Sequence, residues 1–168
     1  MIHNVISSRD ADYSFYIKCD CGKEILHFAY FAETTACQEI IAVKYYGPDS
    51  GQTNDMFTFT QASLRKLADH LKLSLTEEVY SFTLDDGYLS LNVVKDALGF
   101  YIIKKKRYNV ASIEDWEICL RDFSIKLVID ELDIMYNTIS EVREKKNIEW
   151  LENLEKQKEN LKKKEKDI

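Results

Sequence analysis

Proline and glycine are scarce in this chain, with one proline and five glycines in 168 residues. Because these residues mark most tight turns and flexible linkers, their scarcity argues against a linker-rich array of small modules. It favours long, regular elements. The length and the 45% hydrophobic content suit one sizeable core rather than two full domains.

Long apolar runs and a leader pattern are missing as well. The first residues, MIHNVISSRDADY, carry polar and charged side chains without the apolar stretch of a secretory signal. No run approaches the roughly 18–20 apolar residues that a membrane-spanning helix needs. We therefore expect a soluble, cytoplasmic protein without membrane contacts.

Familiar catalytic motifs are absent too. The sequence contains no GxSxG, HExxH, P-loop or GxGxxG pattern, and its three histidines lie outside such motifs. We expect no enzyme activity, no cofactor and no catalytic or cofactor-binding residues. An active site assembled by the fold from residues that no motif reveals is the alternative.

Four cysteines are few for a disulfide framework in a chain of this size, and we expect reduced thiols. Cys19 and Cys21 form a single CxC, which only Cys37 could join, whereas zinc sites usually show two such pairs or a pair of histidines. We predict no metal site, although the sequence leaves open whether these three thiols bind a metal.

Period-two alternation predicts strands in the first third of the chain. Apolar and polar side chains alternate along 13–19, and 24–32 and 38–46 are rich in aromatic and β-branched residues. A short strand at 56–60 follows the loop that holds the proline. The pattern then changes to a helical period: apolar residues recur at Leu64, Leu67, Ala68 and Leu71. We predict a helix over Gln61–Lys72, capped by Thr60.

The same order recurs in the second half. Strands are predicted at 79–84, 88–94, 98–108 and 116–121, with Asp85-Asp86-Gly87 as a hairpin turn, and a helix begins near Asp122. ASLRKLADHL and FSIKLVIDEL align at a constant offset of 61 residues. The apolar positions of two unrelated amphipathic helices would often match by chance. The paired Ser, basic and Asp positions nevertheless favour a duplication.

The predicted fold is therefore α+β, with two β-sheet-then-helix (β4α-like) repeats, mostly antiparallel strands and a long C-terminal helical tail. The domain prediction is a body over 1–140, with repeats at about 13–72 and 79–140, and a charged tail over 141–168.

A heptad seam runs out of the second helix into the tail. It slips at Lys145–Asn147, which leaves open whether the tail bends there. The apolar residues of this seam need a surface to pack against: the body of the same chain, a second copy or another protein. We expect a homo-oligomer, plausibly a dimer. The candidate oligomerisation residues are Val128, Leu132, Met135, Ile139, Val142, Leu151, Leu154 and Leu161.

Charge is distributed unevenly. Residues 141–168 hold nine Lys/Arg against eight Asp/Glu, so the first 140 hold 14 against 21, a net charge of −7. An acidic body suits a basic protein partner better than a polyphosphate. The run YIIKKKRY is the exception: its cations could contact phosphates, or could guard a strand edge against aggregation.

Element order gives the chain a resemblance to a known fold. Four strands then a helix, twice over across residues 13–140, resembles the whirly-type single-stranded nucleic-acid binders, which implies sheet faces that stack bases and oligomers assembled through helices. GFYIIKKKRY followed by WEICLRDFSIKLVIDEL looks like small bacterial immunity proteins, which implies an acidic protein that occludes a basic partner.

The main functional prediction is a non-enzymatic protein-interaction module of inhibitor, immunity or accessory type that self-associates through its C-terminal helix. The alternative is single-stranded nucleic-acid binding. The candidate interaction residues for these two functions are Tyr45, Tyr46, Tyr101, Lys104, Lys105, Lys106, Arg107 and Tyr108.

Overall fold

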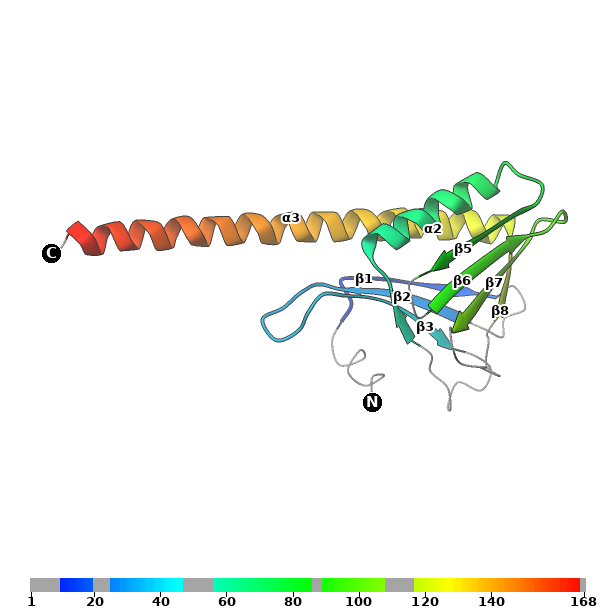
Figure 1. The fold of residues 1–168 in the computed structure, drawn as a ribbon, viewed down its shortest axis with the longest axis horizontal. Coiled ribbons are helices and arrows are strands. Elements are labelled where there is room, and N and C mark those ends of the chain that lie inside the picture. The colour runs from blue at the N-terminus through cyan, green and yellow to red at the C-terminus, as the bar shows by residue number, and fades with distance from the viewer. Residues whose placement is uncertain (1–9, 20–24, 47–55, 86–88, 108–116, 167–168) are drawn as a thin grey trace.

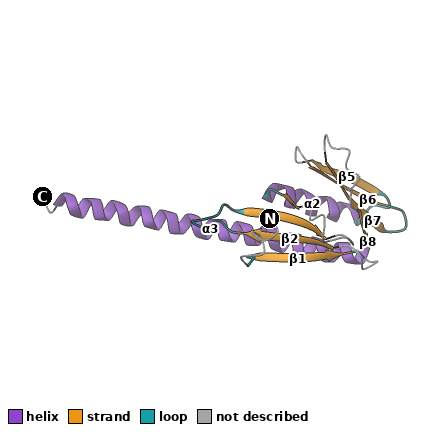
Figure 2. Cartoon of the chain, turned by 90° about the horizontal axis from the view of Figure 1, so that it is seen from below, coloured by secondary structure: helices purple, strands orange, loops and turns teal. Residues whose placement is uncertain are grey.

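The computed structural model describes residues 10–19, 25–46, 56–85, 89–107 and 117–166. The fold is α+β, as predicted: two four-stranded antiparallel sheets, each followed by a helix (Figure 1). Figure 2 shows the two helices lying side by side along the sheets, with the second helix extending far beyond them. In the described part of the chain, no helix has the length and apolar character that crossing a membrane requires.

The first sheet has the strand order β1-β2-β3-β4, and each pair of neighbours is antiparallel. The strands are β1 (Tyr13–Lys18), β2 (Ile25–Phe31), β3 (Ile40–Tyr46) and β4 (Met56–Thr58). Helix α2 (Gln61–Ser74) follows after two residues. As predicted, Thr60 caps this helix: its side chain accepts a hydrogen bond from the Ser63 amide, which would otherwise lack a partner in the first turn.

The second sheet repeats this plan with the order β5-β6-β7-β8. Its strands are β5 (Tyr80–Asp85), β6 (Leu89–Lys95), β7 (Phe100–Arg107) and β8 (Glu117–Arg121). Helix α3 (Asp122–Lys166) begins immediately after β8. Each predicted strand and both helix starts therefore match the structure to within a few residues.

Corresponding positions of the two helices lie in the same kind of environment. Leu64 and Leu71 of α2, and Ile125 and Leu132 of α3, are all completely buried in one continuous core. These are positions that the offset of 61 residues aligns. The two β4α units therefore use equivalent helix faces to cover the inner faces of the sheets.

Helix α3 is one uninterrupted helix of 45 residues, so the slip in the seam at Lys145–Asn147 produces no break. The first part of the seam does not face a second copy, and that prediction is wrong. The residues concerned are buried in the chain's own core: Val128, Leu132, Met135 and Ile139. The physical reason is that the sheets leave an apolar surface that this stripe covers together with α2. Val142 is partly buried against the same core. The division into body and tail at residue 140 stays a prediction.

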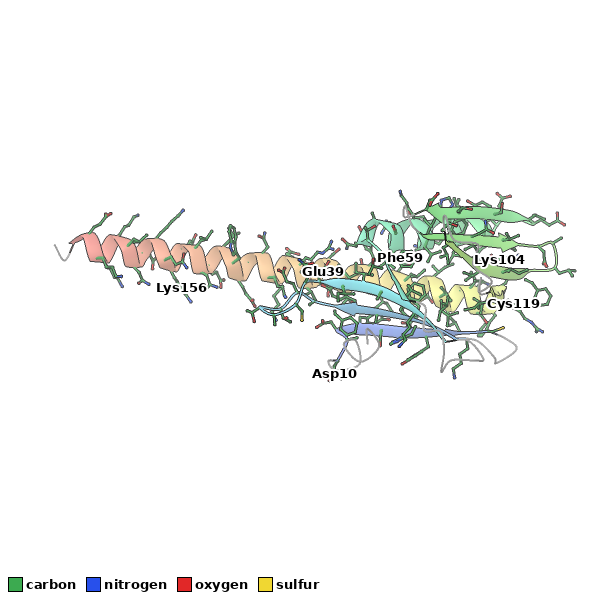
Figure 3. All side chains as sticks on the ribbon, turned by 60° about the horizontal axis from the view of Figure 1, so that its bottom comes forward. Asp10, Glu39, Phe59, Lys104, Cys119 and Lys156 are labelled. Atoms are coloured by element: carbon green, nitrogen blue, oxygen red, sulfur yellow. The ribbon has the colours of Figure 1, made fainter. Side chains whose placement is uncertain are left out.

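An ionic clamp holds the middle of α3 against the body. The Arg143 guanidinium donates hydrogen bonds to both carboxylate oxygens of Glu39, just before β3, and a third to Gln61 Oε1 (2.7 Å) at the start of α2. The Tyr30 hydroxyl donates to Glu39 Oε2 (3.1 Å). These contacts, above all the Arg143 hydrogen bond, hold the pKa of Glu39 below its usual value. Glu39 is labelled beside α3 in Figure 3.

A buried cation joins the second sheet to both helices. Lys95 Nζ donates to the carbonyl oxygens of Ser74 and Glu77 (2.9 Å each), at and beyond the end of α2, and lies 3.5 Å from Asp122 Oδ1 at the start of α3. A cation at the carboxyl end of one helix and a carboxylate at the amino end of another both suit the helix dipoles. Lys95 therefore fixes where the two helices meet the sheet.

Truncation of the shared helix face tests the core. We expect Leu71→Ala and Leu132→Ala each to lower the free energy of unfolding by about 2–5 kcal/mol, because each leaves a cavity in a fully buried site. Urea denaturation measures the change. Leu151→Ala, on the exposed part of α3, is the matched control and should cost less than about 1 kcal/mol. A comparable loss at all three positions would contradict this assignment of the core.

The clamp predicts an acid-dependent loss of stability. Because the pKa of Glu39 is lower in the folded chain than in the unfolded chain, its contribution is present above the unfolded value of 4.5 and is lost as pH falls below it. We expect Glu39→Gln and Arg143→Gln to show a shallower loss of unfolding free energy than the wild type between about pH 5 and 3. An acid response equal to that of the wild type in both variants would show that the pair contributes nothing.

Candidate functional site

Each sheet turns one face to the core and the other outward. On the outer face of the first sheet, a row crosses three neighbouring strands: Tyr16 on β1 pairs with His27 on β2, which pairs with Lys44 on β3. The Tyr16 and His27 rings stack, with centroids 4.1 Å apart and planes within 7° of parallel. Tyr16 remains 60% exposed. The row thus presents an aromatic surface beside a cation.

The second sheet carries a matching row. Thr83 on β5 pairs with Asn92 on β6, which pairs with Lys104 on β7. The Asn92 side-chain amide donates a hydrogen bond to Thr83 Oγ1 (2.9 Å). Lys104 is exposed, and Figure 3 labels it on the second sheet. In this row, two hydrogen-bonding side chains replace the two rings of the first sheet.

The two lysines occupy equivalent places in the fold. Lys44 follows Val43, a central residue of the first sheet that pairs with Phe28 and Phe57. Lys104 follows Ile103, which pairs in the same way with Val93 and Ile118 in the second sheet. Val43 and Ile103 are both buried in the core. The residue after each of them must point to the opposite face, because side chains alternate along a strand.

The rows differ in how much of the cation reaches solvent. Lys44 is only 5% exposed, and burial lowers its pKa. Burial also lowers the pKa of His27, which favours the neutral imidazole in the stack. Lys104 lies open to solvent. The second sheet therefore offers the accessible cation, and the first sheet the accessible ring.

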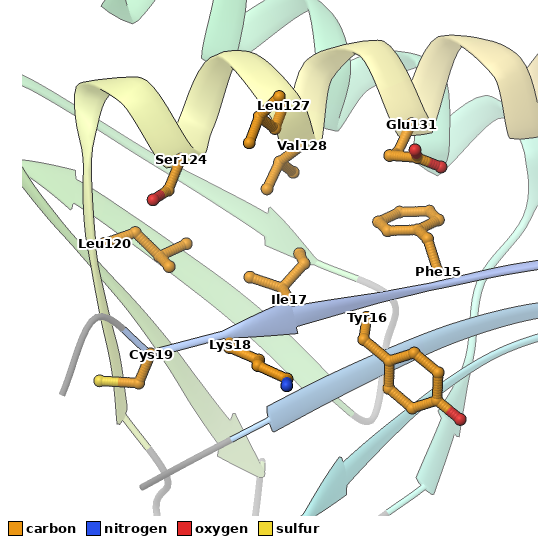
Figure 4. A pocket seen from close by; sticks show the side chains of 10 residues that line it. All are labelled: Phe15, Tyr16, Ile17, Lys18, Cys19, Leu120, Ser124, Leu127, Val128 and Glu131. Atoms are coloured by element: carbon orange, nitrogen blue, oxygen red, sulfur yellow. The ribbon is translucent and has the colours of Figure 1, made fainter. Parts of the chain in front are cut away.

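A hollow of about 460 Å³ opens between the edge strand β1, strand β8 and helix α3 (Figure 4). The apolar part of its wall comes from Phe15 and Ile17 on β1, Leu120 on β8 and Val128 on α3. The polar lining residues are Tyr16, Lys18, Ser124 and Glu131. Such a volume and lining lie within the range of small-molecule and base-sized sites.

Another cation and ring meet at the far end of the second sheet. Arg121 on β8 pairs with Phe100 on β7, and its guanidinium carbon lies 5.5 Å from the centre of the Phe100 ring. Both side chains are exposed. A guanidinium beside an aromatic ring can stack with planar groups.

The structure places the predicted interaction residues in different environments. Tyr101 is completely buried, its hydroxyl 2.6 Å from Ser74 Oγ, so the expectation that it is an exposed contact is wrong. Its strand position places it on the inner face, opposite Leu120 and Lys95. Lys104 is the one candidate whose side chain the structure describes at the surface.

The remaining candidates stay predictions. Tyr45 and Tyr46 belong to β3, and Lys105, Lys106 and Arg107 belong to β7, but their side chains lie outside the described part. Tyr108 lies outside the described residues altogether. The sequence missed Tyr16, His27, Lys44, Thr83 and Asn92. Only the cross-strand register brings them together, although period two already places Tyr16 on the polar face of β1.

The cysteines were considered as metal ligands. The Cys19 thiol is buried, the Cys37 and Cys119 thiols are exposed, and Cys21 lies outside the described residues. Within the described ranges, no group of three or more His, Cys, Asp or Glu side chains is placed to hold a metal ion. Whether Cys21 completes a site is not tested, so the absence of a metal remains a prediction.

Comparisons with known proteins bear on the fold. No family model and no curated protein matches the sequence. Among solved structures, MRP1/MRP2 of Trypanosoma bruciei is similar with a TM-score of 0.50 and 9% identity, over 82% of this chain and 92% of that one. WHY1 of Arabidopsis thaliana gives 0.45 and 13%, over 76% and 84%. The plant transcriptional regulator PBF-2 gives 0.44 and 10%, over 80% and 85%.

The similarity to MRP1/MRP2 corrects the main functional prediction. An inhibitor or immunity-type module was inferred from the acidic body and from the likeness of the second half to immunity proteins. The similarity instead extends over most of the chain and is to the fold that the nucleic-acid alternative implied. At 9% identity it shows the fold alone, and that fold is the whirly-type arrangement of two β4α units.

Proposed function

We propose that this protein binds single-stranded nucleic acid across the outer faces of its two sheets, without catalysing a reaction on it. The observation that carries the proposal is the matched pair of rows, each of which crosses three strands and ends on a lysine, Lys44 or Lys104. Lys104, which is exposed, provides a contact point for a phosphate backbone, and the nearly covered Lys44 adds positive charge at the equivalent place in the first sheet.

The side chains next to each lysine suit the other parts of a nucleotide. The exposed Tyr16 ring, already stacked on His27, has a free face on which an unpaired base can stack. Asn92 and Thr83 offer donors and acceptors that can contact base edges or ribose hydroxyls. Duplex nucleic acid hides its base faces in the helical stack, so this combination favours a single strand.

The hollow beside β1 supports the same proposal. Its apolar wall, with Phe15 and Val128, can take the flat surface of a splayed base. Lys18, exposed on the same strand, also borders the hollow and adds positive charge there. Tyr16 also lines the hollow, so it is continuous with the first row.

The acidic body does not conflict with this surface. Among the described outward side chains on the strands, four carry a positive charge (Lys18, Lys44, Lys104 and Arg121) and one carries a negative charge (Asp85). Glu117 is the register partner of Lys104 on β8. The negative charge lies instead largely on helices and loops. Local charge governs the contact with phosphates, while net charge sets the rate of approach and its salt dependence.

Binding to labelled oligonucleotides tests the proposal. We expect fluorescence anisotropy at about 50 mM salt to show single-stranded RNA or DNA binding that weakens steeply with added salt and exceeds duplex binding. Lys104→Glu should weaken binding by about tenfold or more, because it replaces a phosphate contact with a repulsive charge. Tyr16→Ala should weaken it by about fivefold or more through lost stacking.

Lys66→Glu, the same charge reversal on the exposed side of α2, is the matched control and should retain most of the affinity. If single strands fail to bind at about 50 mM salt, the proposal is wrong. Equal losses in Lys104→Glu and Lys66→Glu would place binding away from the sheet faces.

A further inference from the structure

The helix side of the hollow beside β1 has a polar residue at each end and apolar residues between them. Ser124 and Glu131 are seven residues apart on α3, about 10 Å along the helix axis. Leu127 and Val128 lie between them and also line the hollow. Figure 4 shows Ser124 and Glu131 at opposite ends of this part of the helix. A ligand that fills the hollow therefore meets a different group at each end.

The hollow combines a covered floor with an exposed rim. Phe15 and Val128 are 7% and 6% exposed, whereas Leu127 and Tyr16 are 52% and 60% exposed. The rim can contact a group that enters from solvent, and the floor can receive its apolar surface. An unpaired nucleobase has two flat apolar faces and a polar edge, and such bases insert between protein side chains. The hollow therefore suits the base of a nucleotide better than its phosphate.

Glu131 places a carboxylate at one end of the hollow. The Tyr13 hydroxyl donates a hydrogen bond to Glu131 Oε2, which orients this carboxylate. Burial, this hydrogen bond and the charge of Glu131 all raise the pKa of Tyr13, so the hydroxyl remains a donor. A carboxylate has about four acceptor sites, so the bond to Tyr13 leaves acceptors for a ligand. These acceptors bind N–H donors strongly and repel a phosphate.

The Watson–Crick edges of the bases differ in what they offer to a carboxylate. Guanine presents two donors side by side, the N1–H and the 2-amino group, which together can bond both carboxylate oxygens. Adenine and cytosine present an amino donor next to a ring-nitrogen acceptor, which a carboxylate repels. Uracil and thymine present one N–H between two carbonyl acceptors. Guanine is therefore the base whose edge complements Glu131.

We infer that the hollow holds a guanine of the bound single strand, with the ring against Phe15 and Val128 and with its N1–H and 2-amino group donating to Glu131. The inference rests on the proposed function, because it assigns an identity to one base of the bound strand. Tyr13 is a positioning residue, since it touches Glu131 and acts through it. Binding then depends on the base at one position as well as on charge.

Single strands that differ at one position test the identity of the base. We expect fluorescence anisotropy to show about tenfold tighter binding of an oligothymidine with one central guanine than of the same strand with adenine there. Hypoxanthine at that position lacks the 2-amino group and should remove most of this advantage. Equal affinities for the three strands would overturn the inference and leave the proposed function in place. If none of the strands binds, both are wrong.

Substitution of the carboxylate tests the residue. Glu131→Gln replaces one acceptor oxygen with an amide donor, so the ratio of the guanine-strand affinity to the adenine-strand affinity should fall to about one. Asp130→Asn, the same change at an exposed neighbouring position, is the matched control and should keep the ratio. Tyr13→Phe should lower the ratio less than Glu131→Gln does, because the carboxylate remains but loses its orienting bond.

A guanine preference that Glu131→Gln leaves unchanged, or that Asp130→Asn removes equally, would exclude Glu131 as its source. Urea denaturation of each variant confirms that it is folded, so that a changed ratio reports on the hollow. The ratio compares two strands on the same protein, and a general loss of affinity therefore cancels from it.

Discussion

The structure depends on the covering of two apolar sheet faces by two helix stripes. Each four-stranded sheet has an inner face of aromatic and branched side chains whose removal from water stabilises the fold. α2 and α3 supply the missing surface from equivalent positions, with Leu71 and Leu132 completely buried. With both inner faces covered, Tyr16 of the first sheet and Lys104 of the second remain exposed on the outer faces.

Polar contacts then fix where the helices lie on that core. Lys95 joins the end of α2, the second sheet and the start of α3, and the Arg143–Glu39 pair holds the middle of α3 to the first sheet. In both contacts at least one partner lies at the end of a helix or strand, where polar groups lack hydrogen-bond partners within that helix or strand. The antiparallel strand pairing in turn aligns Tyr16 with His27 and Lys44, and Thr83 with Asn92 and Lys104.

The two units share a plan but have diverged at the surface. In the first row two rings stack and the lysine is nearly covered, whereas in the second two polar side chains hydrogen bond and the lysine is exposed. The core positions beneath are constrained by packing, while outward positions are free to differ. Neither the net charge nor the basic run YIIKKKRY predicts this difference between the two rows, because both describe residues that the fold places on different surfaces.

The amino-acid sequence by itself determined the order and type of the elements. Period two at 13–19 and period 3.6 at Leu64–Leu71 record which residues must face the core, and that pattern is local. It could not determine which side chains meet, because cross-strand register and helix docking bring together residues far apart in the chain. Tyr101 was therefore expected at the surface and is buried. Val128–Ile139 was expected to face a second copy and instead covers the chain's own sheets. The equivalence of Lys44 and Lys104 is visible only from the strand pairing.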